Sequence, residues 1–149
     1  MRWATFVLVA LVATGCNDLR DFRGRWEGPR VGDAEEVRVG VGQDAHAQLT
    51  VDDIDQHGLS GTLTVDGLAT NAPIVSLAGA EADALSDMTF AGSPLRVYMA
   101  FAGISDGKGD ALAMIALFDH DRIEVRVMRG GTAPLYGIFA LTEAPEETP

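Results

Sequence analysis

The densest group of side chains that could do chemistry lies at residues 52–58, Asp-Asp-Ile-Asp-Gln-His-Gly. Carboxylates and an imidazole at this spacing could hold a divalent cation, and the candidate ligands are Asp53, Asp55 and His57. An EF-hand calcium loop beginning at Asp53 would need a bidentate glutamate at its twelfth position, where this chain has Thr64. We therefore interpret the segment as an acidic hairpin turn and predict neither a metal ion nor a cofactor.

The remaining polar groups give no stronger signal for catalysis. The segment 106–110, Asp-Gly-Lys-Gly-Asp, has Lys108 where a calcium ligand should stand, so it is interpreted as a turn. The three histidines, His46, His57 and His120, fall on different predicted hairpins, whereas a three-histidine zinc site needs them to converge. No nucleophile elbow, phosphate-binding loop, dinucleotide fingerprint or zinc-protease motif occurs. We predict that the protein is not an enzyme.

Cys16 is the only cysteine, and it ends a stretch with one cation, a short apolar run and small residues. The apolar run is too short to cross a bilayer as a helix in the mature protein, so residues 1–15 are interpreted as a secretory signal. The sequence Ala13-Thr14-Gly15-Cys16 resembles the lipobox of bacterial lipoproteins. The resemblance implies cleavage before Cys16 and acylation of that cysteine.

An acylated Cys16 would place the protein in the cell envelope. Two or more acyl chains anchor a protein stably, whereas a single chain does not. The next residue is Asn17 rather than the aspartate that favours inner-membrane retention in enterobacterial lipoproteins. The lipid bilayer is therefore the first expected partner, with the outer membrane favoured over the inner membrane in a Gram-negative cell.

Composition indicates one acidic domain. The chain has 11 Lys and Arg against 22 Asp and Glu, a net charge of −11. Such a surface argues against nucleic-acid binding, which needs a basic stripe to displace counterions. We divide the chain into the signal at 1–15, a lipidated tether at 16–21, one domain at 22–143 and an acidic, disordered tail at 144–149.

Alternation of apolar and polar residues predicts an all-β domain. In residues 123–129, Ile123, Val125 and Val127 share one face, while Glu124 and Arg126 share the other. Two later segments, residues 97–102 and 112–118, are apolar on both faces. We also predict them as strands, because each is short and is flanked by turn residues. The pattern predicts about eight or nine antiparallel strands in a single meander, drawn from ten candidate segments: 22–28, 35–41, 46–52, 58–66, 72–78, 88–91 (optional), 95–103, 110–118, 122–129 and 134–142.

The first predicted strand contains Gly24-Arg25-Trp26, and this Gly-x-Trp pattern followed by hairpins resembles the lipocalin and calycin-like β-barrels. The resemblance implies a small up-and-down barrel with Trp26 closing one end. It also implies that Arg126 or Arg129 stacks over the tryptophan by a cation–π contact, and that residues 135–142 close the barrel. A two-sheet β-sandwich would produce almost the same sequence pattern and remains the alternative.

Three functions are compatible with these features. The first is binding of a small apolar ligand, in a cavity expected to be lined by apolar side chains of the first and late strands: Trp26, Val97, Met99, Phe101, Leu112, Met114 and Phe118. The same residues could instead fill a solid core. The second is docking to an envelope protein through an apolar outer face on residues 95–103 and 110–118. An envelope hydrolase is the least supported.

Overall fold

The computed structural model describes residues 18–32, 40–77, 90, 92–118 and 121–145. One short 3-10 helix, η1 (Leu19–Phe22), precedes the eight strands. These are β1 (Gly24–Val31), β2 (His46–Ile54), β3 (Leu59–Val65), β4 (Ala69–Val75), β5 (Arg96–Ala102), β6 (Ala111–Leu117), β7 (Ile123–Arg129) and β8 (Leu135–Glu143). Across the described residues, no helix has the length and apolar character needed to span a membrane.

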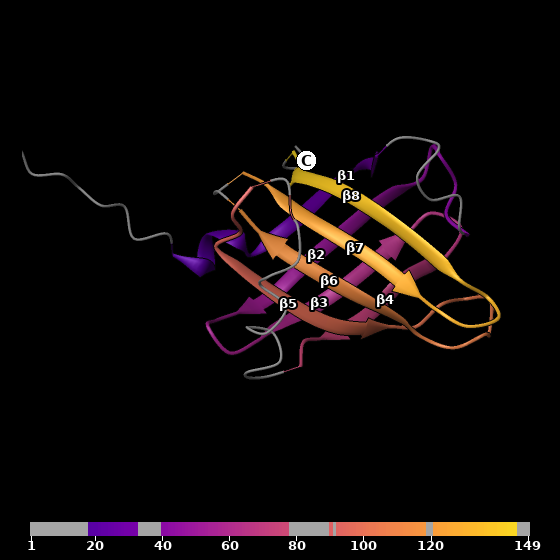
Figure 1. Cartoon of the computed structure of the whole chain (residues 1–149). Helices are drawn as coiled ribbons and strands as arrows, with labels where there is room; N and C mark the ends of the chain where they lie inside the picture. Colours follow the sequence, from indigo (N-terminus) through magenta and orange to yellow (C-terminus); the bar gives the residue numbers. More distant parts are fainter. Residues whose placement is uncertain (1–17, 33–39, 78–89, 91, 119–120, 146–149) are drawn as a thin grey trace, which may run out of the picture.

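The strands form one antiparallel sheet in the order β4-β3-β2-β1-β8-β7-β6-β5, which wraps into a nearly closed barrel (Figure 1). Strands that are neighbours in sequence pair with one another except β4 and β5, and β1 pairs with β8. The outermost strands, β4 and β5, meet through one bridge, Ser76 to Ala100, and one bond from Leu77 N to Met99 O at 2.7 Å. The predicted all-β up-and-down barrel is confirmed, and the two-sheet sandwich is wrong.

Eight predicted strands correspond to observed ones, with boundaries displaced by up to a few residues. At β4, for example, the strand begins at Ala69 rather than 72, because a tight turn with Gly67 at φ 70° lets the chain reverse at once. The predicted strands 35–41 and 88–91 lie mostly outside the described residues. Their described parts, including Gly40 and Val41, are not in strands.

The barrel interior is filled by the side chains that the alternating pattern points inward. On β3, for example, Leu59, Leu63 and Val65 are buried, whereas Ser60 and Thr62 are partly exposed. The main core contains large, fully buried side chains from η1 and most strands: Phe22, Trp26, Leu49, Leu63, Ile74, Ile115, Leu117, Ile123, Phe139 and Leu141. This side-chain volume packs the inside of the barrel as a core.

Trp26 closes the barrel end from which the N-terminal segment departs, here called the η1 end. Its indole is fully buried and stacks on Phe22, with ring centroids 5.7 Å apart. Its Nε1 donates a hydrogen bond to the Phe22 carbonyl at 2.9 Å, so the buried indole N–H is satisfied. At the same end, the backbone N–H of Ala144 donates to the Arg25 carbonyl at 2.8 Å, which extends the β1–β8 contact into the predicted tail.

Candidate interaction surface

Four consecutive strands, β3 to β6, carry only one charged residue, Arg96. The guanidinium of Arg96 donates a hydrogen bond to the Gln56 carbonyl in the turn between β2 and β3. Each of the other four strands contains charged residues, and the chain as a whole has net charge −11. Among the described strands, these four therefore carry fewer charged side chains than the other four.

Register makes this side a continuous row of uncharged side chains. Ser60 on β3 pairs with Val75 on β4, and the bridge between Ser76 and Ala100 brings Val75 beside Phe101 on β5. Phe101 in turn pairs with Leu112 on β6. We call six uncharged, exposed or partly exposed residues of β3, β4 and β5 the uncharged face: Ser60, Thr62, Thr64, Pro73, Val75 and Phe101.

Two large apolar side chains on the uncharged face are open to solvent. Val75 is 72% exposed and Phe101 is 55% exposed. Leu77, two residues after Val75 in the chain, is 38% exposed. Single exposed apolar residues are ordinary, but neighbouring ones on a surface without charges are typical of a binding site.

The residues predicted to line a cavity do not line the barrel interior together. Trp26 belongs to the main core. Val97, Met99, Met114 and Phe118 form a second buried cluster with Ala116, and Leu112 packs against it. On β5 and β6 the alternate residues, such as Tyr98 and Ile115, belong to the main core, so this second cluster lies on the outer side of the sheet. The predicted interior lining is therefore wrong, and Phe101 is solvent-exposed.

At the second cluster, two arginines stack on two phenylalanines, Phe118 within the cluster and Phe90 packed against it. Arg122 lies over the Phe118 ring at 4.0 Å, and Arg126 lies over the Phe90 ring at 4.4 Å. The two rings meet edge to face with centroids 6.1 Å apart. Arg126 also forms an ion pair with Glu124 at 2.6 Å, and each of these two side chains is only 10% exposed. Arg126 thus stacks on Phe90, and the predicted stacking on Trp26 is wrong for this residue.

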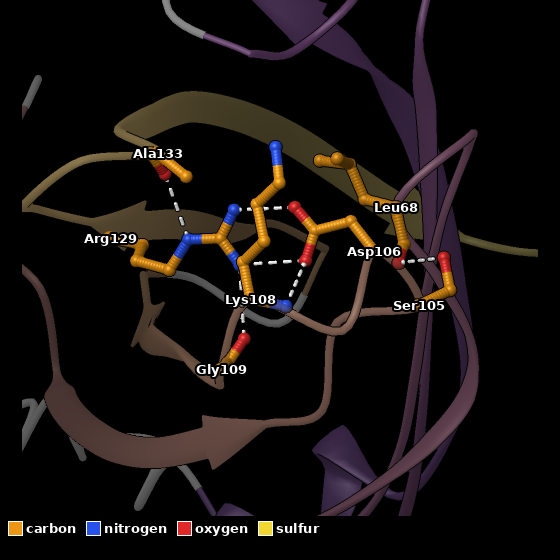
Figure 2. Close-up of polar contacts among 7 residues, drawn as sticks. All are labelled: Leu68, Ser105, Asp106, Lys108, Gly109, Arg129 and Ala133. Atoms are coloured by element: carbon orange, nitrogen blue, oxygen red, sulfur yellow. Dashed lines mark hydrogen bonds and ion pairs between the residues drawn. The ribbon is translucent and has the colours of Figure 1, made fainter.

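Arg129 pairs with Leu135 at one end of β8, whereas Trp26 pairs with Glu143 at the other end. The alternative prediction, that Arg129 stacks over Trp26, is therefore also wrong. Its guanidinium donates to both carboxylate oxygens of Asp106, at 3.0 and 2.6 Å, and to the carbonyls of Gly109 and Ala133 (Figure 2). These bonds join the β5–β6 turn to the β7–β8 turn. The pKa of the Asp106 carboxyl is held at about 2, first by the bond from Arg129 and then by the Lys108 N–H.

The candidate metal ligands Asp53 and Asp55 lie at the η1 end, where their carboxylates bond to other groups of the protein. The Asp55 carboxylate accepts the backbone N–H groups of His57 at 2.7 Å and Gly58 at 2.9 Å. These two bonds lower the pKa of Asp55. Asp53 forms an ion pair with Arg23. Within the described segments, no three His, Cys, Asp or Glu side chains are grouped as metal ligands.

Two surface cavities flank this turn. One of about 290 Å³ is lined by Asp53, Asp55, His57, Leu59 and Val75, among others, and one of about 560 Å³ by residues of η1 and the turn. The histidines do not converge: His46 begins β2, whereas His57 follows the other end of that strand. His120 and Cys16 lie outside the described residues.

Val75, Pro73 and the threonines of β3 were not predicted as site residues. From residue 59 to residue 75 the sequence has one charged residue, Asp66, which lies in a turn. This scarcity of charge is the signal that could have identified them. No protein-family model matches the chain, and neither a curated protein nor a solved structure matches it significantly.

Proposed function

We propose that this chain is a non-enzymatic bacterial lipoprotein of the cell envelope that docks a protein partner on its uncharged face. The observation that carries the docking proposal is the adjacency of Val75 and Phe101, both more than half exposed, on two strands whose only charged residue is Arg96. Burying these two side chains against a partner removes apolar area from water.

Binding of a small apolar ligand inside the barrel has less support. Large side chains, among them Trp26, Leu63 and Phe139, fill the interior. The late-strand residues proposed as lining belong to the second cluster or to the exposed surface. A protein partner uses the exposed residues where they are, without reopening a packed core.

The anchor is supported by the lipobox-like sequence that ends at Cys16. Its test is intact mass and membrane fractionation of the wild type beside Cys16→Ala. We expect the wild type to gain diacylglyceryl mass and to sediment with membranes, and the variant to do neither. An unmodified, soluble wild type would overturn the lipoprotein proposal.

Docking is tested by photocrosslinking in cells. A photoreactive benzoylphenylalanine replaces Phe101 in one sample and Tyr136, a partly exposed aromatic residue on β8, in the other. We expect a protein adduct at position 101 and none at position 136. Equal labelling at both positions, or none at either, would contradict a docking site on the uncharged face.

A further inference from the structure

We propose that the cavity of about 560 Å³ at the η1 end binds the phosphoethanolamine head group of a phospholipid in the bilayer that holds the anchor. The inference rests on the proposed function, because an acylated Cys16 is what would hold this end of the barrel against a membrane. It is carried by the length of the chain between the anchor and the cavity, and by the charges that line the cavity.

The chain between Cys16 and the cavity is short. Asp18, a residue of the cavity wall, follows Cys16 by two positions, and two residues span at most about 7 Å even when fully extended. Each polar layer of a bilayer is itself roughly 5–7 Å deep. An acylated Cys16 would therefore hold the cavity at the level of the lipid head groups, at the end of the barrel where the indigo N-terminal segment departs (Figure 1).

The cavity wall offers an opposite charge to each charge of this head group. The Asp18 carboxylate accepts the Arg20 N–H through Oδ1 at 3.0 Å, and the Asp55 carboxylate accepts two backbone N–H groups, also through Oδ1. Neither Oδ2 atom accepts a hydrogen bond from a described residue, so both can accept from an ammonium group. Arg20 is exposed on the same wall, and a guanidinium binds phosphate through paired N–H donors.

The same wall discriminates among phospholipid head groups. The anionic head group of phosphatidylglycerol would bring its negative charge beside two carboxylates of a chain with net charge −11, with no ammonium group to offset them. The quaternary ammonium of phosphatidylcholine has no N–H to donate, and proteins bind such groups in aromatic cages. None of the described residues that line this cavity is Phe, Tyr or Trp. A primary ammonium group beside a phosphate therefore fits the lining best.

The experiment uses the full acylated chain, extracted from membranes in detergent and mixed with equal amounts of phosphatidylethanolamine, phosphatidylcholine and phosphatidylglycerol. Native mass spectrometry counts the lipid adducts on the protein. We expect phosphatidylethanolamine adducts to exceed either of the others by about tenfold. Arg20→Glu should reduce them by about tenfold, because it replaces the group that binds phosphate with a like charge.

Two further variants locate the site. Asp18→Ser keeps a side chain that can cap η1 but removes the carboxylate, so it should abolish the preference for phosphatidylethanolamine over phosphatidylcholine. Lys108→Glu makes the same charge reversal as Arg20→Glu in the turn between β5 and β6, where Asp106 bonds to Arg129, and should leave the adducts unchanged. Circular dichroism melting of the three variants checks that each remains folded.

The outcomes separate this inference from the lipoprotein proposal. The intact mass of the wild type shows whether Cys16 is acylated, whichever lipid the protein then binds. An acylated chain that binds the three lipids equally would overturn the head-group site and leave the lipoprotein proposal standing. Equal loss of adducts in Lys108→Glu and Arg20→Glu would do the same. A wild type without acyl chains would overturn both.

Discussion

The Tyr98 hydroxyl donates a hydrogen bond to the backbone carbonyl of Asp55 at 2.6 Å. Tyr98 lies on β5 and Asp55 follows β2, and around the barrel β3 and β4 lie between these two strands across the β4–β5 junction. Burial raises the pKa of Tyr98 to about 12, so this hydroxyl remains a donor at neutral pH. Together with the bond from Arg96 to Gln56, it ties the turn to β5 across the weakly paired β4–β5 junction.

Tyr98→Phe should therefore lower the free energy of unfolding by about 1–3 kcal/mol, because the Asp55 carbonyl loses its donor in a partly buried site. Urea denaturation followed by circular dichroism measures the change. Tyr136→Phe is the control, since the Tyr136 hydroxyl has no hydrogen-bond partner within the described part of the chain. Equal losses in both variants would show that the bond does not stabilise the barrel.

Acid should weaken the connection between Asp106 and Arg129. Because the pKa of Asp106 is lowered to about 2 in the folded protein, its contribution to stability is complete above the unfolded pKa of about 4. That contribution is lost as the pH falls from about 4 towards 2.

Asp106→Asn tests this dependence. The urea midpoint of the variant should lie below that of the wild type at pH 5, and the difference should shrink by pH 2. Asp110→Asn changes an exposed carboxylate in the same turn and serves as the control. A wild-type–variant difference that stays constant over this range would argue against the ion pair as its cause.

Gly28→Ala should prevent closure of the barrel between β1 and β8. A Cβ at Gly28 would stand 1.9 Å from the Ala140 carbonyl oxygen, a backbone atom that cannot move aside without disturbing β8. We expect a loss of more than about 3 kcal/mol, at or beyond the usual cost of overpacking. Gly130→Ala, where nothing lies within 4 Å, should unfold at nearly the wild-type urea concentration. A folded Gly28→Ala protein of wild-type stability would contradict the β1–β8 register.

Arg126→Met should destabilise the protein by about 3–5 kcal/mol, because it leaves the Glu124 carboxylate nearly buried without its partner. The double variant Glu124→Leu, Arg126→Met should recover much of that loss, since both charges are then absent. A double-mutant cycle of unfolding free energies provides the measurement. Additive losses would mean that the two side chains act independently.

Much of the barrel follows from the sequence by itself. Alternation in segments such as 123–129 determines both that they are strands and which side faces inward, because successive side chains point to opposite faces of a sheet. Tight turns make successive strands antiparallel neighbours, as at Gly67 between β3 and β4. The acidic composition is likewise known from the sequence alone. Lipidation at Cys16 remains a prediction.

Only the tertiary structure decided the orientation of β5 and β6. In these strands both sets of alternate residues are apolar, so a period of two cannot tell the inward set from the outward one. Packing points Tyr98 and Ala100 into the main core and leaves Phe101 exposed. Contact between β4 and β5 joins segments far apart in the chain, and the bridge from Ser76 to Ala100 brings Val75 beside Phe101. The candidate surface comes from that register, which local sequence patterns do not encode.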